Sequence, residues 1–187
     1  MDPTQQLWLI STVFAGAHVL GSYAAGVQSP HRARLLVGWP WSVLWPWIAS
    51  AVLTAVSFLY VQWYVVWWIA AEEIGVLLGV AHSLFLASAQ HWMMLSIASF
   101  DDRALKPWVS ANLVVTAIAS VLYLAALVMV EQESQLHYGL GVASGVVLVA
   151  QHVVWDAVVW NVDFWRQAST KTTVRRNPSS NRGVFRR

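Results

Sequence analysis

The sequence predicts an all-α integral membrane protein: a bundle of five transmembrane helices, with the N-terminus outside and the C-terminus inside. Three observations support this prediction. The 187 residues are 58% hydrophobic and 11% charged, with a mean hydropathy of +0.54, whereas a soluble domain carries about 25% charged residues. Five apolar stretches reach the length of about 20 residues that a bilayer crossing requires. Finally, the positive charges alternate between the segments that join these stretches.

The predicted spans are residues 7–27, 43–63, 74–98, 108–130 and 138–160, within one membrane domain of residues 1–165. The first stretch lacks a preceding basic segment and a cleavage site, so we expect it to remain as a helix. A turn is predicted at Glu72-Glu73 between the second and third spans. Four aromatic residues before it are typical of an interfacial belt: Trp63, Tyr64, Trp67 and Trp68.

The charge distribution predicts the orientation. From the N- to the C-terminus, the segments outside the spans contain 0, 2, 0, 2, 0 and 7 lysines or arginines. Five of the nine acidic residues lie on the opposite side: Asp2, Glu72, Glu73, Glu131 and Glu133. By the positive-inside rule, the N-terminus is outside. The basic tail, residues 166–187, has no apolar period. We predict that it is disordered and contacts anionic membrane lipids on the cytoplasmic side.

Each predicted span carries small or polar residues at helical spacing. Such residues let membrane helices approach closely and hydrogen-bond across the contact. The stripes are Ser11, Ala15, His18 and Ser22; Ser50, Thr54 and Ser57; Gly75, Gly79 and His82; Asn112, Thr116, Ser120 and Tyr123; and Gly141, Gly145, His152, Asp156 and Asp163. These stripes are predicted to form the inner faces of the bundle. The same stripes could also contact helices of a second copy in a homodimer, or of other subunits in a larger membrane complex.

Three histidines are expected near the membrane midplane, because the first, third and fifth spans run in the same direction: His18, His82 and His152. Three roles remain open. His18 and His152 could be the axial ligands of a haem. His152 and Asp156, one turn apart, could form a proton-handling pair. Each histidine could also serve packing alone, through a hydrogen bond to a neighbouring helix.

Asp156 is the one carboxylate well inside the predicted hydrocarbon. A charged side chain there costs about 2.5–3.5 kcal/mol on insertion scales, and such acids are functional candidates by default. Asp156 shares a helix face with Gly141, Gly145 and His152, so it is expected to point into the bundle.

Several function classes are excluded by what the sequence lacks. Without cysteine there are no disulfides, thiolate metal sites or cysteine nucleophiles. No lysine or arginine lies deep in a span, which excludes a retinal Schiff base and a voltage sensor. Phosphate-binding loops, nucleophile elbows and dense carboxylate–histidine clusters are missing as well. We therefore expect a non-enzymatic protein, and the confinement of basic charge to the loops and the tail predicts no nucleic-acid partner.

Three short segments suggest a family. GWPWSVLWPW (38–47) is similar to a Pro- and Trp-rich segment before a second helix, and QHW (90–92) to an Asn-Trp pair, with His91 replacing Asn. WNVDFWR (160–166) is similar to an Asn-aromatic-Trp-Arg helix ending. With five spans and 13 tryptophans, the chain resembles the tryptophan-rich sensory protein or translocator protein family. That family's Leu-Tyr after the Pro-Trp segment and its Pro pair in the third helix are missing.

The resemblance implies a pocket inside the bundle that binds a tetrapyrrole or a sterol-like lipid. Its implied ligand-binding residues are Trp39, Trp41, Trp45, Trp47, Trp92 and Asn161. We therefore expect a multi-pass membrane protein, in contact with lipids, that binds an apolar small molecule, with haem or another tetrapyrrole as the candidate cofactor. Two alternatives stay open: a haem-b-binding or accessory subunit of a larger membrane complex, and a proton or ion pathway through His152 and Asp156.

Overall fold

The structure is a computed structural model that describes residues 1–31, 39–70, 74–130 and 134–166. These residues form five long helices: α1 (Pro3–Gln28), α3 (Trp41–Trp68), α4 (Val76–Ser99), α5 (Lys106–Met129) and α6 (Gln135–Val149), which continues without a break into the π-helix η3 (Ala150–Trp160). A short 3-10 helix, η2 (Arg103–Leu105), precedes α5. The all-helical prediction is confirmed, and each predicted span coincides with a helix. The predicted turn at Glu72-Glu73 and the tail beyond Arg166 lie outside the described residues.

Local sequence explains where several helices begin. The Asp2 side chain accepts a hydrogen bond from the Gln5 backbone N–H, and the Gln5 side chain accepts one from the Asp2 backbone N–H. This reciprocal capping box, with Pro3 in the first turn, is a strong helix start. Asp102 caps η2 in a similar way by accepting from the Ala104 N–H. The first turn of α5 then contains Pro107, whose missing N–H needs no partner there.

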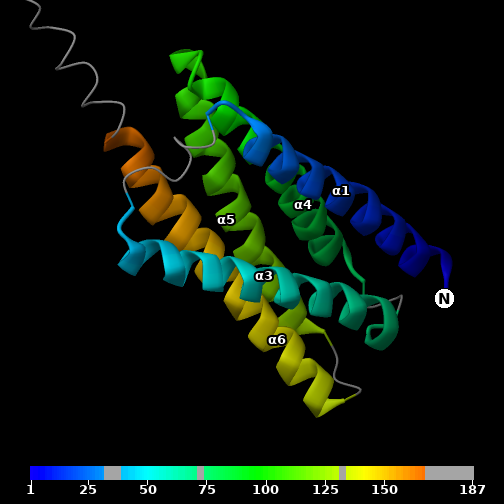
Figure 1. The fold of residues 1–187 in the computed structure, drawn as a ribbon. Coiled ribbons are helices and arrows are strands. Elements are labelled where there is room, and N and C mark those ends of the chain that lie inside the picture. Colours follow the sequence, from blue (N-terminus) through cyan, green and yellow to red (C-terminus); the bar gives the residue numbers. More distant parts are fainter. Residues whose placement is uncertain (32–38, 71–73, 131–133, 167–187) are drawn as a thin grey trace, which may run out of the picture.

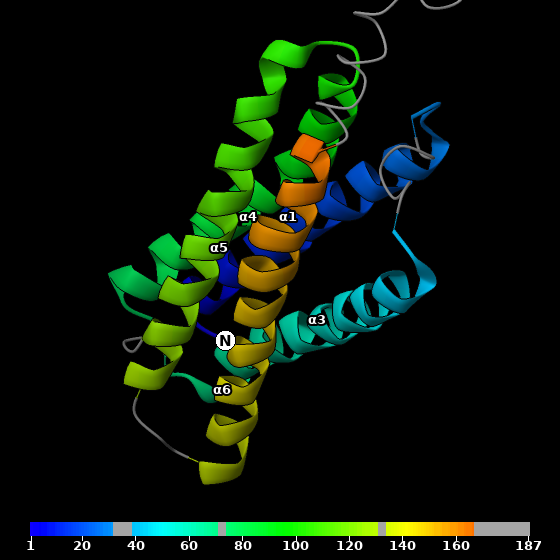
Figure 2. The ribbon, with the colours of Figure 1, turned by 90° about the vertical axis from the view of Figure 1, so that its left-hand side faces the viewer.

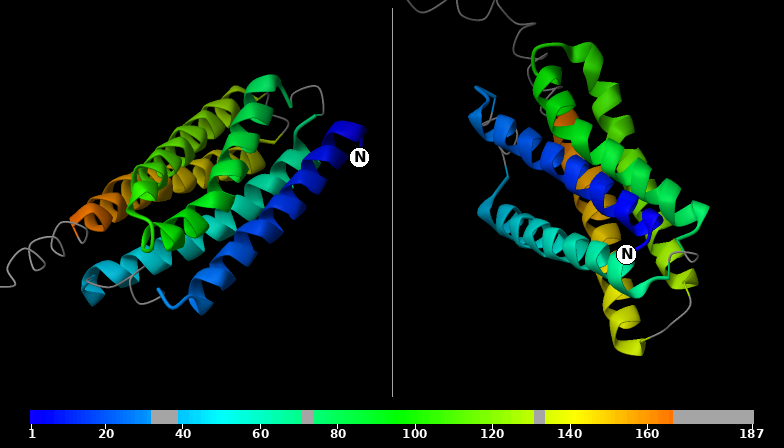
Figure 3. Two further views of the ribbon diagram at one scale, coloured as in Figure 1. Left: turned by 90° about the horizontal axis from the view of Figure 1, so that it is seen from above. Right: turned by 90° about the vertical axis from the view of Figure 1, so that its right-hand side faces the viewer.

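The five helices pack in a fixed order of neighbours. α4 lies between α1 and α5, α5 packs along α6 and η3, and α3 packs mainly against α6 (Figures 1 and 2). α1 and α3 run next to each other in the view from above in Figure 3, although they contact over fewer residues. Residues of α4 and η3 are thereby brought into the same interior although they are far apart in the sequence.

Four of the described helical segments are long and apolar enough to cross a membrane: Pro3–Gln28, Trp41–Trp68, Arg103–Met129 and Gln135–Arg166. Their outward faces carry large apolar side chains, such as Leu7, Phe14 and Leu20 of α1, which are all exposed. The chain is therefore a multi-pass integral membrane protein. α4 is not among these four segments, and it carries polar residues that are buried: His82, Ser88 and Ser96.

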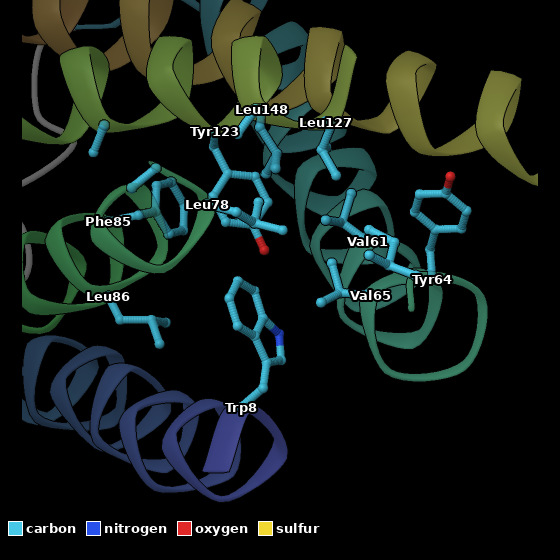
Figure 4. Packing of buried hydrophobic residues seen from close by; sticks show 14 of the residues in the cluster. Trp8, Val61, Tyr64, Val65, Leu78, Phe85, Leu86, Tyr123, Leu127 and Leu148 are labelled. Carbon is cyan, nitrogen blue, oxygen red and sulfur yellow. The ribbon is translucent and has the colours of Figure 1, made fainter. Parts of the chain in front are cut away.

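The main core joins all five helices. It lies near the N-terminal end of α1 and the C-terminal end of α3. Figure 4 shows Trp8 of α1 below Tyr123 of α5, whose hydroxyl points toward the indole, with Phe85 of α4 beside Tyr123. α6 approaches through small residues, as predicted. A Cβ added to Gly141 would lie 2.9 Å from the ring of Tyr64, which is buried. A second cluster contains Trp160 and Phe164 at the other end.

Candidate functional site

A cluster of three polar side chains lies on the π-helix η3. The Asp156 Oδ2 lies 2.9 Å from the His152 Nδ1, and the Gln151 Nε2 donates to the Asp156 Oδ1 at 3.1 Å. His152 and Asp156, one turn apart, are thus in contact, as the pair considered among the three open roles requires. Gln151 and Asp156 are five residues apart, and backbone bonds in a π-helix also join residues five apart. The π-helical turn therefore lets one carboxylate contact both side chains.

The cluster faces the interior of the bundle. The side chains of His152 and Asp156 are 13% and 18% exposed, and Gln151 is 4% exposed. The His152 ring meets Phe85 of α4 edge-on, with ring centroids 5.0 Å apart. Residues of η3 and α4 thus meet at this cluster.

Two polar atoms of this cluster are buried without a hydrogen-bond partner among the described residues: the Gln151 Oε1 and the His152 Nε2. Each belongs to a side chain whose other polar atom contacts Asp156. Buried polar groups in folded proteins almost always have a partner, because an unsatisfied one costs about 1–3 kcal/mol. The cluster therefore has the capacity to hydrogen-bond a further polar group.

A second polar cluster lies closer to the N-terminal end of α1 and has Gln62 of α3 at its centre. The Gln62 Oε1 accepts from the Trp8 Nε1 at 2.8 Å and from the Thr12 Oγ1 at 3.0 Å. The Gln62 Nε2 donates to the Tyr123 hydroxyl at 3.2 Å. One buried amide therefore ties together α1, α3 and α5.

His82 adds α4 to this Gln62 cluster. Its ring stacks on Trp8 with centroids 3.9 Å apart, and its Nε2 lies 3.2 Å from the Thr12 Oγ1 and 3.4 Å from the Ser11 Oγ. Both hydroxyls donate their protons elsewhere, to Gln62 and to the Trp8 carbonyl. In this arrangement of hydrogen bonds, the His82 Nε2 is the donor to the two hydroxyl oxygens. His82 thus links α4 to α1, as the packing role considered for it requires.

The other histidines lie apart from these two clusters. His18, expected on the inward face with Ala15 and Ser22, is exposed, and its Nδ1 lies 3.2 Å from the Phe14 carbonyl of the same helix. Ala15 and Ser22 are buried as predicted. His91 is also exposed. This placement gives no support to a haem held between His18 and His152.

The predicted ligand-binding tryptophans separate into three groups. Trp39 donates to the Asp163 Oδ2 at 3.0 Å and meets Trp47 edge-on. Trp41 and Trp45 stack on each other at the surface, where they are 69% and 59% exposed. Trp92 meets both Tyr23 of α1 and Trp160 of η3 edge-on. Trp92 therefore contacts η3, the helix that carries the polar cluster, through Trp160.

Asn161, the last predicted ligand-binding residue, lies one residue beyond η3. Its Oδ1 accepts from the Ser110 Oγ of α5 at 2.7 Å, and the Trp165 Nε1 donates to the same Ser110 oxygen at 2.9 Å. Asn161 therefore connects the C-terminal end of the helix formed by α6 and η3 to the start of α5.

An open apolar groove of about 320 Å³ runs between α5 and η3. Its lining residues are Val114, Ala117, Ile118, Val121, Leu122, Val153 and Ala157. Val153 and Ala157 each follow a member of the polar cluster, His152 and Asp156. An apolar surface and a buried polar cluster thus share one segment of η3.

Four residues of the two clusters were not expected from the sequence: Gln151, Gln62, Trp8 and Thr12. A usable signal existed for the two glutamines: each is an isolated amide inside an otherwise apolar stretch, where polar residues hydrogen-bond to other helices. Trp8 carried no comparable signal, because tryptophan is equally common at membrane interfaces.

No protein-family model matches the chain, no curated protein matches its sequence, and no solved structure matches its fold.

Proposed function

We propose that this protein binds an apolar small molecule, a tetrapyrrole or a sterol-like lipid, inside the membrane and performs no chemistry on it. The observation that supports this most is the pair of buried, unpartnered atoms, the Gln151 Oε1 and the His152 Nε2. A ligand with one polar group can satisfy them, and the same segment of η3 lines an apolar groove with α5 that suits an apolar body. Small-molecule sites combine apolar walls with a few polar groups in this way.

A proton pathway, the other role considered for His152 and Asp156, is less favoured by the geometry. The two polar clusters are separated by Phe85, whose ring lies 6.4 Å from that of Tyr123 and 5.0 Å from that of His152. A proton relay needs adjacent groups that exchange hydrogen bonds, and a phenyl ring provides none. The cluster around Asp156 is therefore better suited to holding a ligand.

Binding can be tested with the purified protein in detergent. We expect protoporphyrin or a sterol to raise the temperature of unfolding in proportion to the logarithm of ligand concentration, because a ligand of the folded state stabilises it by mass action. Gln151→Leu should weaken this effect, whereas Gln28→Leu, at the exposed end of α1, should not. Unfolding temperatures that stay constant with both ligands would contradict the proposed function.

We also propose that all five helices cross the membrane, with the N-terminus outside. An odd number of crossings puts the two ends on opposite sides, whereas four crossings would put them on the same side. Since the chain has no cysteine, Thr4→Cys and Ser180→Cys supply single labelling positions. We expect an impermeant maleimide to label position 4 in intact cells and position 180 only after permeabilisation. Labelling of both from one side would show that α4 does not cross.

A further inference from the structure

We infer that the cluster of Gln151, His152 and Asp156 selects ligands that carry a hydroxyl group, as in an alcohol or an undissociated carboxylic acid, over ethers, ketones and esters. This inference rests on the proposed function and specifies the polar group that the site takes. It follows from the protons that the three side chains can carry.

The first step concerns His152. The Asp156 carboxylate and the His152 imidazole are in contact in a poorly solvated interior, where an isolated net charge is costly. Because the Gln151 amide donates to the Asp156 Oδ1, that oxygen carries no proton, and the pair is neutral overall in two forms. Either Asp156 is protonated and donates to the His152 Nδ1, or an ionised Asp156 accepts from a doubly protonated His152. In both forms the Nε2 carries a hydrogen, so the Nε2 is a donor.

The second step concerns Gln151. Its Nε2 donates to the Asp156 Oδ1, which leaves its Oε1 as a carbonyl acceptor. That oxygen and the His152 Nε2 are both buried and unpartnered among the described residues. Gln151 and His152 each contact one oxygen of the Asp156 carboxylate. Gln151 therefore offers one free acceptor, and His152 offers one free donor.

The third step matches these atoms to a ligand. A hydroxyl that reaches both atoms accepts from the Nε2–H through its oxygen and donates its own proton to the Oε1, so each atom gains a partner. An ether, ketone or ester can only accept, and leaves the Gln151 carbonyl buried without a donor. Sites that hydrogen-bond a hydroxyl discriminate strongly against analogues that lack it, for this reason.

The selectivity can be measured with two probes that share one apolar body: 1-pyrenebutanol and its methyl ether. The 13 tryptophans serve as energy donors to the bound pyrene in the full-length protein in detergent. We expect the alcohol to bind about tenfold more tightly than the ether, a factor that corresponds to about 1.4 kcal/mol. In the Gln151→Leu variant, the affinity for the alcohol should fall to that for the ether. The control variant Gln28→Leu should keep the wild-type ratio of the two affinities.

Each outcome has a distinct meaning. Equal affinities of wild-type protein for the two probes would overturn the hydroxyl selectivity and leave the proposed function intact. Failure of both probes, together with constant unfolding temperatures in protoporphyrin and sterol, would overturn both proposals. If Gln151→Leu does not fold, the wild-type ratio alone decides.

Discussion

Replacing Gln62 with leucine is expected to destabilise the bundle more than any other single change at a polar residue of the main core. Leucine keeps the size but removes the acceptor of the Trp8 indole and Thr12 hydroxyl protons, and also the donor to Tyr123. Each stranded buried group costs roughly 1–3 kcal/mol. The loss should appear as a lower free energy of unfolding when the protein in detergent micelles is unfolded with SDS.

Two controls separate the Gln62 cluster from a general effect of losing a glutamine. Gln28→Leu at the exposed end of α1 should leave stability almost unchanged. Tyr123→Phe removes only one of the three hydrogen bonds and should cost less than Gln62→Leu. If Tyr123→Phe and Gln62→Leu were equally destabilising, Gln62 would not be the centre of the cluster.

The second large effect is expected at the His152–Asp156 pair. His152→Ala leaves the half-buried Asp156 carboxylate with Gln151 as its remaining hydrogen-bond partner among the described residues. Breaking a buried pair from one side typically costs about 3–5 kcal/mol, because the other group stays behind uncompensated. Adding Asp156→Asn should recover part of this loss, since an amide has no charge and can still accept from Gln151. Unfolding free energies of the two single variants and the double variant measure the coupling directly.

His18→Ala is the matched control for this cycle. His18 is exposed and bonds to its own helix, so its removal should change stability little. A double variant no more stable than His152→Ala would show that the charge of Asp156 does not matter for the fold.

The polar pair on η3 was predictable because its spacing is local. Residues four apart meet on any helix, so the sequence predicts contact between His152 and Asp156 without knowledge of the neighbours. Gln151 was not predictable in this way. Five residues correspond to an offset of about 140° on an α-helix, which points the two side chains apart. The π-helical conformation, which no sequence pattern indicated, brings Gln151 back to Asp156.

The helices themselves were predictable because bilayer thickness and hydropathy determine their length and position. The rotation of each helix about its own axis and the identity of its neighbouring helices were not predictable. On α1, the expected inward stripe included His18, but Trp8, Thr12 and Ala15 form the buried face. His18 lies about 60° from Ala15 around the helix. That rotation depends on Gln62 of α3 accepting from Trp8 and Thr12. Such a tertiary contact leaves no local pattern in either helix.

The Gln62 cluster also implies an order of assembly during synthesis. Gln62 and Tyr123 are 61 positions apart, and at about 5–20 residues per second translation needs roughly 3–12 s to reach the second after the first. Within this interval Trp8 and Thr12 already exist and can occupy the amide oxygen of Gln62, whereas its N–H still lacks the Tyr123 hydroxyl. α6 emerges last and joins by placing Gly141 against Tyr64. The partners that fix the register of α1 on α3 are thus all present in the nascent chain before the last helix arrives.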